Sequence, residues 1–316
     1  MPGAVLAHRA RPPLPRKRNG SGETGPRPAD TVRAVVSDPA PTRPTASRLR
    51  PLAAPFGLLA ALTVAVLAGP LVWPHGPNDM DFTAMLAAPS AAHPMGTDSS
   101  GRDVLARFLA GGRLSVMVAA IVMAGGLIAG GLIGIVAASA GGLVDAALMR
   151  AMDAIAAFPP ILLAMAVSIG LGGGLWTAVL GITLSTLPFF ARLMRGEVLR
   201  ILSLPFIRAA EAMAASPAFI FRWHVIPHAA TTMLVQAAAV FGYAIITLAG
   251  LGFVGLGAAP PAAEWGAMIT DGMGYALTGQ WWLTVFPGLG ILLGVISANV
   301  LADRLSIVLA GAERQA

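Results

Sequence analysis

The sequence predicts an all-α fold, a polytopic transmembrane helical bundle with six spans. The composition is the first reason, because 56% of the 316 residues are hydrophobic, 11% are charged and the mean hydropathy is +0.74. A soluble protein of this size needs more charged residues to cover its surface. The second reason is that apolar runs of about 20 residues, the length that crosses a hydrocarbon core, recur along the chain. The chain has no cysteine, which excludes disulfides and thiolate metal sites.

Residues 1–50 form a basic tail that differs from the rest of the chain. They contain ten Lys and Arg against three Asp and Glu, with prolines throughout. Such a segment cannot bury a core, so we expect a disordered cytoplasmic tail. A run such as RPPLPRKR could bind nucleic acid, acidic lipid or a proline-recognition module, but we favour a solvated tail with no nucleic-acid partner. No signal peptide opens the chain, so the first apolar run reads as an uncleaved signal anchor.

The six expected spans follow this tail in order. The first span and the polar segment behind it make up residues 51–113, and the other five lie in a transmembrane core at residues 114–310. We place the spans at residues 56–73, 114–138, 154–171, 175–190, 231–256 and 281–300. Pro159 and Pro160 interrupt the third span, which neighbouring helices tolerate by satisfying the freed carbonyl groups. Glycines four residues apart in the second span permit close helix packing in lipid.

The distribution of basic residues predicts the orientation of the spans. The tail carries a net charge of +7, and the loop between the fourth and fifth spans, with five Arg and two Glu, carries +3. The loops on the other side have three Arg against four Asp in one case, and only Glu264 and Asp271 in the other. By the positive-inside rule, both chain ends and the loop between the fourth and fifth spans face the cytoplasm.

Some aromatic and charged side chains lie near the ends of the predicted spans, and we predict a role for each. Trp265, Trp281 and Trp282 are expected to be interfacial anchors on the outer side. Asp153 lies at the cytoplasmic mouth of a span, with Arg150 in reach as a structural partner. Charged residues within the spans, the usual mark of proton- or ion-coupled transport, are essentially absent.

The loop between the fourth and fifth spans, near residues 197–228, is the most informative segment. Residues 204–213 and 217–223 both suit short helices, and Ser216 with Pro217 can cap and open the second of them. We therefore expect a helical elbow that protrudes from the bundle. Such an elbow can insert into a groove on another protein and transmit its movement.

The same loop resembles the cytoplasmic "EAA" loop of ABC-importer permeases. That pattern has a charged or polar residue, two alanines, a glycine four residues after the second alanine, and a closing I-x-L-P. The matching positions here are Arg208, Ala209, Ala210, Ala214, His224 and Pro227. A glycine at this position would allow a positive φ at no steric cost, but Ala214 stands there instead. An alanine disfavours a left-handed bend, so we expect the elbow to stay helical through Ala214. His224 and His228 are spaced as two metal ligands could be, but no third ligand is evident, and we assign His224 to the loop motif.

Three further segments extend the resemblance to the dipeptide, oligopeptide and nickel permeases. HPMGTDSSGRDVLARFLAGGRLSV, at residues 93–116, is similar to their H-P-x-G-T-D-x-x-G-R-D-V-x-S-R segment. GGLVDAALMRAMDAIAAFP, at residues 141–159, is similar to their turn into the third span, and LGFVGLGAAPPAAEWGAMITDG, at residues 251–272, to their F-L-G-L-G-x-x-P-P-x-x-x-W-G segment. The four motifs occur in the family's order over residues 56–310, and the single span before the first one matches the second permease type.

The resemblance implies a type I ABC-importer permease (MetI-like) fold in a bacterial inner membrane. It also implies three kinds of partner besides the lipid bilayer: a homologous sister permease, two ATP-binding cassette ATPase subunits and an extracytoplasmic substrate-binding protein, which Trp265 could contact. The implied transport is alternating access, most consistent with peptides and next with nickel or another small solute. The six residues of the loop pattern, Arg208, Ala209, Ala210, Ala214, His224 and Pro227, would couple the permease to its ATPase.

Several functions are disfavoured by motifs that the sequence lacks. It has no G-x-x-x-x-G-K-[ST] phosphate loop, and its single lysine is Lys17, so we expect ATP and Mg²⁺ to bind to partner subunits and this chain to have no cofactor. It has no nucleophile elbow and no H-E-x-x-H zinc motif, which argues against a membrane-embedded enzyme. An ATP-independent channel or secondary transporter is a further alternative, against which the missing charges within the spans and the elbow argue.

Overall fold

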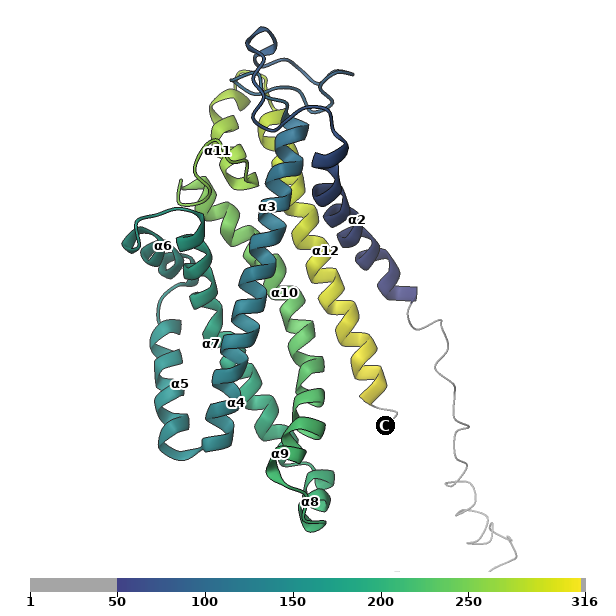
Figure 1. The fold of residues 1–316 in the computed structure, drawn as a ribbon, viewed down its shortest axis with the longest axis vertical. Helices are drawn as coiled ribbons and strands as arrows, with labels where there is room; N and C mark the ends of the chain where they lie inside the picture. The colour runs from purple at the N-terminus through teal and green to yellow at the C-terminus, as the bar shows by residue number, and fades with distance from the viewer. Residues whose placement is uncertain (1–49, 314–316) are drawn as a thin grey trace, which may run out of the picture. The chain divides into compact units, whose positions relative to one another are not determined.

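The structure is a computed structural model that describes the backbone of residues 50–313. Within this part of the chain it is helical apart from loops and one isolated β-bridge between Thr97 and Asp103, which confirms the all-α fold class (Figure 1). The predicted disordered tail lies outside the described residues, except for Arg50. The elements in order are α2 (Arg50–Val72), η2 (Phe82–Ala84), α3 (Val104–Gly125), η3 (Gly126–Gly130), α4 (Gly131–Ala140), α5 (Gly142–Ala156), α6 (Pro160–Gly170), α7 (Leu175–Leu202), α8 (Pro205–Ala212), α9 (Pro217–Ile220), η4 (Phe221–Val225), α10 (Ile226–Phe253), α11 (Trp265–Ala276) and α12 (Trp282–Glu313).

Four helices in the described residues are long and apolar enough to cross a membrane. They are Val104–Ala140, Leu175–Leu202, Pro217–Phe253 and Trp282–Ile307. Each contains most of a predicted span and extends beyond it, because polar residues can continue a helix after the apolar run ends. A shorter apolar helix, Ala60–Val72, lies within α2 at the first predicted span. The total of six spans therefore stays a prediction, whereas a multi-pass membrane protein is shown.

The third predicted span is a broken one, not a single helix. The predicted residues 154–171 contain α6 and only the end of α5, and these two helices are bent by 88° relative to each other. The chain leaves the helical conformation at Pro159, and Pro160 opens α6. Two consecutive prolines remove two backbone donors and crowd the preceding turn, which is why the helix stops here. The expected partner of Asp153 was also wrong, since its carboxylate lies 2.9 Å from Nη2 of Arg192 on α7 rather than at Arg150.

Glycines bring α3 and α4 against α7, as the spacing in the second span predicted. A Cβ atom placed at Gly130 would lie 2.7 Å from Cβ of Phe190, and one at Gly134 would lie 2.8 Å from the backbone nitrogen of Arg195. Larger side chains at these two positions would force the helices apart. The π-helical turn η3 lies between α3 and α4 and keeps Gly126, Gly130 and Gly134 on the buried side.

The main core lies where α3, α10, α11 and α12 meet, and it corrects the prediction for two tryptophans. Trp265 is fully buried, stacks on Phe108 at 5.4 Å and donates from Nε1 to the carbonyl oxygen of Phe108 at 3.0 Å. Trp282 is buried as well, and its Nε1 donates to the carbonyl oxygen of Thr97 at 3.2 Å. Only Trp281 keeps the exposure of an interfacial anchor, with half of its surface accessible. The sequence shows that a tryptophan lies near the end of a span, but the tertiary fold decides whether its ring faces the lipid or the core.

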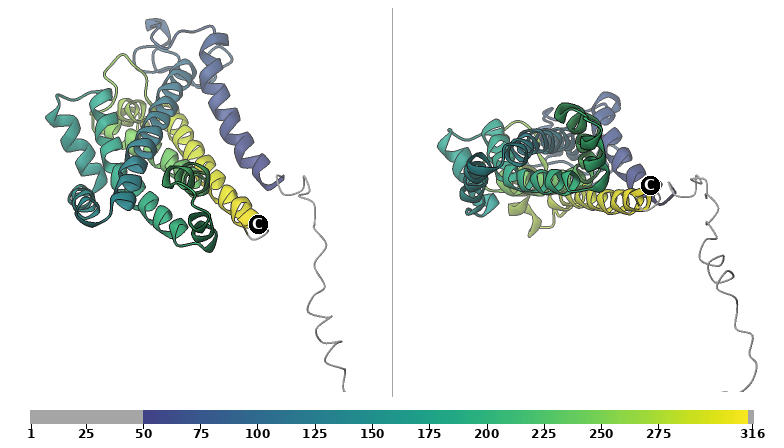
Figure 2. Two further views of the ribbon diagram at one scale, coloured as in Figure 1. Left: turned by 60° about the horizontal axis from the view of Figure 1, so that its bottom comes forward. Right: turned by 90° about the horizontal axis from the view of Figure 1, so that it is seen from below.

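The remaining helices surround this core. α2 packs against α3 and α12 at one edge of the bundle, whereas α5 and α6 pack against α4 and α7 at the opposite edge (Figure 2). The two ends of the bundle differ: α11 and the loop before α3 lie at one end, and α8 and α9 protrude at the other (Figure 1). We refer to these as the α11 end and the elbow end.

Candidate functional site

The elbow consists of residues 203–227, which connect α7 to α10 and include all six residues of the loop pattern. Its first limb is α8, which starts at Pro205, where the missing amide hydrogen costs nothing. Leu204 is extended before it, and the amide of Ile207 bonds to the carbonyl of Leu204 at 3.1 Å. One face of α8 is buried, at Ile207 and Ala210, while Arg208 and Ala209 are exposed.

The bend of the elbow corrects the expectation for Ala214. This residue has φ +58°, in the left-handed region, and α8 ends at Ala212 instead of continuing through the bend. The amide of Ala215 donates to the carbonyl of Ala210 at 3.1 Å, and that of Ala214 donates to Glu211 at 2.9 Å. These two bonds are those of a Schellman motif, in which the left-handed position is usually glycine.

The helix ends here despite the alanine because of the residues that follow. Ser216 precedes Pro217 and is held in the extended region, at ψ 149°, which an α-helix cannot accommodate. The chain must therefore turn before Ser216, and Ala214 is where the backbone bonds of the Schellman motif require the turn. A left-handed alanine costs about 1–2 kcal/mol of conformational energy. In return, the carbonyl groups of Ala210 and Glu211 gain hydrogen-bond donors at the end of α8.

The second limb runs without a break into a membrane-spanning helix. Ser216 caps it as predicted, its hydroxyl accepting from the amide of Phe219 at 3.3 Å, and Pro217 occupies its first turn. The π-helical turn η4 follows, in which the amide of Ile226 bonds to the carbonyl of Phe221. This wider turn directly precedes Pro227, whose ring would crowd a regular helix and which has no amide to donate. The two predicted short helices are thus one short helix and the start of a 37-residue helix.

A small apolar core of its own holds the two limbs together. Side chains of α7, α8, α9, η4 and α10 contribute to it, and the end of α4 packs against it. Its buried members are Val198, Ile201, Ile207, Ala210, Ile220, Val225 and Ala229. Ala210 is therefore a packing residue of the elbow, in contrast to Ala209 next to it. The elbow is a packed structure, not a loose connection.

The outer surface of the elbow is apolar and aromatic, a property that the six-residue loop pattern does not indicate. Phe206, Met213, Phe219 and Trp223 are large apolar side chains between 40% and 78% exposed. His224 lies between the limbs, with its ring 5.8 Å from Phe206 and 5.8 Å from Phe219. The alternation of these residues with the buried ones, at helical spacing on both limbs, is the sequence signal that would have revealed them.

The arginines of this end divide into paired and unpaired groups. Arg195 binds Asp145 through two hydrogen bonds of 2.6 Å, Arg192 pairs with Asp153, and Arg200 pairs with Glu197. Arg208 and Arg222 take part in no ion pair within the described residues, although Arg222 lies over the ring of Trp223 at 5.8 Å. The exposed positive charge of the elbow therefore comes from these two arginines, and Glu211, which is exposed on α8, adds one negative charge.

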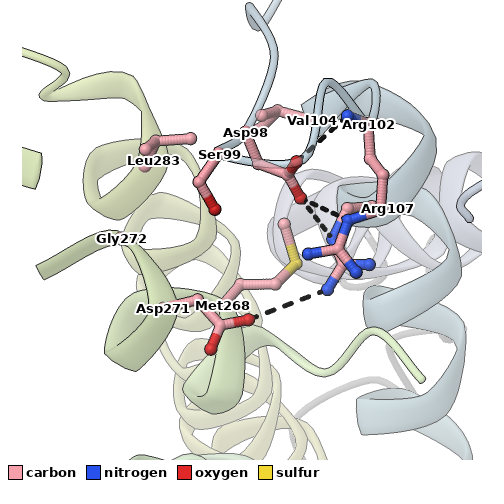
Figure 3. A pocket seen from close by; sticks show the side chains of 9 residues that line it. All are labelled: Asp98, Ser99, Arg102, Val104, Arg107, Met268, Asp271, Gly272 and Leu283. Atoms are coloured by element: carbon pink, nitrogen blue, oxygen red, sulfur yellow. Dashed lines mark hydrogen bonds and ion pairs between the residues drawn. The ribbon is translucent and has the colours of Figure 1, made fainter. Parts of the chain in front are cut away.

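The other end of the bundle carries a buried polar cluster, at the start of α3. Arg107 is 4% exposed, and its guanidinium lies 3.5 Å from Asp98 and 3.9 Å from Asp271. Figure 3 shows Asp98 between Arg102 and Arg107, beside a cavity of about 20 Å³, with Asp271 approaching from α11. The cluster ties the G-T-D-x-x-G-R-D segment to α11, so a motif that was noted only for resemblance has a structural role.

The side chain of His228 contacts the backbone of His224. Nδ1 of His228 lies 2.6 Å from the carbonyl oxygen of His224, which restrains its ring, and the structure places no third ligand with them among the described residues.

Comparison with known proteins identifies the family. Residues 130–307 match the model of the binding-protein-dependent transport system inner membrane component. The chain belongs to this family. The permease is 38% identical over 246 residues to a probable D,D-dipeptide transport system permease protein of Escherichia coli, covering 78% of this chain and 82% of that protein.

Other relatives agree with this assignment. The permease is 37% identical over 276 residues to a putative peptide permease protein of Brucella suis, covering 85% and 91% of the two chains. It is 36% identical over 244 residues to a dipeptide transport system permease protein of Alkalihalophilus pseudofirmus, covering 77% and 80%. A chain of the MetNI methionine ABC transporter in an inward-facing conformation superposes with a TM-score of 0.51 at 21% identity, covering 66% of the permease and 97% of that chain. The predicted family and the MetI-like fold are confirmed.

Proposed function

We propose that the permease carries peptides across the bacterial inner membrane in an ATP-driven importer, and that its elbow docks on an ATPase subunit. The peptide substrate is supported by the names of the relatives, three of which are dipeptide or peptide permeases. Nickel or another small solute is the second candidate substrate.

The observation that carries the coupling role is the continuity of the helix Pro217–Phe253. The second limb of the elbow and the membrane-spanning helix α10 are the same helix, so a displacement of the elbow moves α10 without an intervening hinge. The apolar core of the elbow makes α8 move with it. Force applied to the outer surface of the elbow is thereby transmitted into the bundle.

α10 also lines the cavity that would respond to this movement. An open cavity of about 370 Å³ lies between α6, α7 and α10, with Pro160, Ser185, Thr186, Phe189, Gln236, Ala239, Val240 and Tyr243 around it. Its lining combines apolar side chains with hydroxyl and amide groups that can hydrogen-bond to a peptide backbone. In an alternating-access cycle, tilting of α10 would change the width of this cavity.

The six residues of the loop pattern would have different tasks in coupling. Arg208 and Ala209 would contact the ATPase, since they are exposed on α8. Ala210 would hold α8 on the core of the elbow, and Ala214 would set the angle between the limbs. His224 would keep the limbs in contact through Phe206, and Pro227 would fix the wide turn that leads into α10.

The remaining assignments follow from the role of a transport subunit. ATP and Mg²⁺ would bind to two ATPase subunits, because this chain has no phosphate loop. A sister permease would complete the pathway, and an extracytoplasmic binding protein would deliver the substrate to the α11 end. Both chain ends and the elbow would then face the cytoplasm, with residues 1–50 as a basic tail, residues 51–113 as the first span with its outer segment, and residues 114–310 as the core containing the coupling loop.

Reconstitution tests this proposal. The purified permease should hydrolyse no ATP, and proteoliposomes that also contain its sister permease and ATPases should take up peptide when loaded binding protein and ATP are supplied. A cysteine at Ala209 should cross-link to the ATPase subunit, and one at Ala262, at the α11 end, should not. Uptake driven by an ion gradient without ATP would overturn the proposal, as would hydrolysis by the permease alone.

A further inference from the structure

A cluster of two histidines and one aspartate lies at the α11 end, outside the coupling elbow. His75 follows the end of α2, His93 lies in the loop before α3, and Asp103 is the N-cap residue of α3. One ligand atom of each lies within 4.8 Å of the other two, and no second group of this kind occurs in the part of the chain that the structure describes. We propose that these three side chains form a binding site for one divalent transition-metal cation.

The chemistry of the three ligands selects the class of cation. Two imidazoles and one carboxylate are the ligands of Zn²⁺ and similar borderline cations, whereas Ca²⁺ and Mg²⁺ prefer oxygen ligands alone. The chain contains no cysteine that could bind the ion as thiolate. A water molecule would complete a tetrahedral site, because His75 and His93 are each partly accessible.

The distances fit one ion after a small rearrangement of the three side chains. Neighbouring ligands of tetrahedral Zn²⁺ lie about 3.3 Å apart when each bond is about 2.0–2.1 Å long. Nδ1 of His93 is 2.7 Å from Oδ2 of Asp103, and the outer limit of the cluster is 4.8 Å. The pair His93–Asp103 would have to open slightly, whereas separations near the outer limit would have to shorten, and small side-chain rotations within the cluster would provide both changes.

The carboxylate of Asp103 is oriented for this role by its surroundings. Its Oδ1 accepts from Nε1 of Trp73 at 3.1 Å and from the amide of Ala106 at 2.7 Å, which leaves Oδ2 directed at His93. Hydrogen bonds that orient a ligand in this way are usual around metal ions. The side chain of Asp103 is almost fully buried, and a buried carboxylate is stabilised by a nearby positive charge, which the cation supplies.

His75 distinguishes a metal site from an ordinary capping interaction. The pair His93–Asp103 alone could be a hydrogen bond that holds the loop on α3. His75 lies outside the motifs of the resemblance, yet its ring lies 5.1 Å from that of His93 and 5.9 Å from that of Trp73. A bound ion would connect the end of α2 directly to the start of α3.

Zinc binding by the full-length chain, purified in detergent without a polyhistidine tag, tests this inference. We expect one Zn²⁺ per chain by elemental analysis, and Co²⁺ in its place should give the intense visible absorption of a tetrahedral site. His75→Phe keeps an aromatic ring for stacking but removes a ligand, and it should weaken Zn²⁺ binding by at least about 100-fold, beyond the usual effect of an outer-shell change. Asp103→Asn retains a capping side chain and should also weaken binding.

The control is His228→Ala, which removes a histidine at the elbow end and should leave the zinc affinity unchanged. Zn²⁺ should raise the thermal midpoint of the wild-type chain and not that of His75→Phe. A wild-type chain that binds no zinc, or zinc binding that survives in His75→Phe, would overturn the inference. Neither result bears on the elbow or on peptide transport, so the two proposals fail separately.

Discussion

The amide of Ala215 donates to the carbonyl of Ala210 across the left-handed residue Ala214, at 3.1 Å. This bond holds the second limb of the elbow at a fixed angle to α8. The left-handed backbone at position 214 favours glycine, so alanine there raises the energy of the folded chain. A substitution at Ala214 can measure this conformational cost.

Ala214→Gly should stabilise the permease. Removing the strain of a left-handed alanine should raise the free energy of unfolding by about 1–2 kcal/mol. The greater freedom of glycine in the unfolded chain should lower it by about 0.4–1 kcal/mol. The thermal midpoint in detergent should rise slightly, with transport retained. Ala209→Gly, at an exposed position inside α8, is the matched control and should lower the midpoint by the equivalent of about 1 kcal/mol. A lower midpoint for Ala214→Gly would contradict the left-handed assignment.

Ala209→Asp and Ala210→Asp should fail in different ways, although they are neighbours. Ala209 is exposed, so its variant should fold normally and lose ATPase subunits on pull-down, as should Arg208→Glu. Ala210 is 6% exposed, and an unpaired charge there should unfold the elbow itself, at a cost of several kcal/mol. Limited proteolysis separates the two effects. Intact ATPase association and full transport in both Ala209→Asp and Arg208→Glu would show that this face of α8 is not the docking surface.

Cysteine labelling should define the orientation of the bundle. The chain contains no cysteine, so single substitutions need no altered background. Ala262 and Ser216 are both exposed, at the α11 end and the elbow end. An impermeant thiol reagent added to intact cells should label Ala262→Cys and should label Ser216→Cys only after lysis. The reverse pattern would place the elbow outside the cell.

Glu264 should make stability depend on pH. Burial raises the pKa of this carboxyl above its ordinary value of 4.5, although the amides of Gly266 and Ala267 donate to it. The folded chain therefore binds a proton that the unfolded chain has released, and stability falls as pH rises from about 4.5 to the folded pKa. Thermal midpoints measured across this range should decline for the wild type and decline less for Glu264→Gln. Equal slopes would show that Glu264 does not titrate within the fold.

The sequence was sufficient where a local pattern controls the structure. Hydropathy placed the long helices, Ser216 and Pro217 predicted the start of the second limb, and glycine spacing predicted the close packing of α3 and α4 on α7. Each of these depends on residues within a few positions of one another. The six residues of the loop pattern all lie in the elbow, and their role in coupling stays a prediction.

Predictions failed where distant residues decide the outcome. Trp265 and Trp282 are core residues because Phe108 and Thr97, far away in the sequence, accept from their indole nitrogens. Asp153 pairs with Arg192 because α5 lies beside α7. Ala214 is a local exception: it adopts a conformation that alanine disfavours, because Ser216 and Pro217, two and three residues further on, forbid the alternative. The apolar surface of the elbow was missed although each limb carries its helical spacing, because only the fold brings the exposed faces of the two limbs together into one surface.

The helix Pro217–Phe253 has 37 residues, which at a rise of about 1.5 Å each gives a rod of about 55 Å. A hydrocarbon core is about 30 Å thick, so much of this rod stands outside the lipid. In the proposed coupling, such a rod would act as a lever that pivots within the bilayer. A tilt of about 5° would displace one end relative to the other by about 5 Å, roughly the advance of one helical turn.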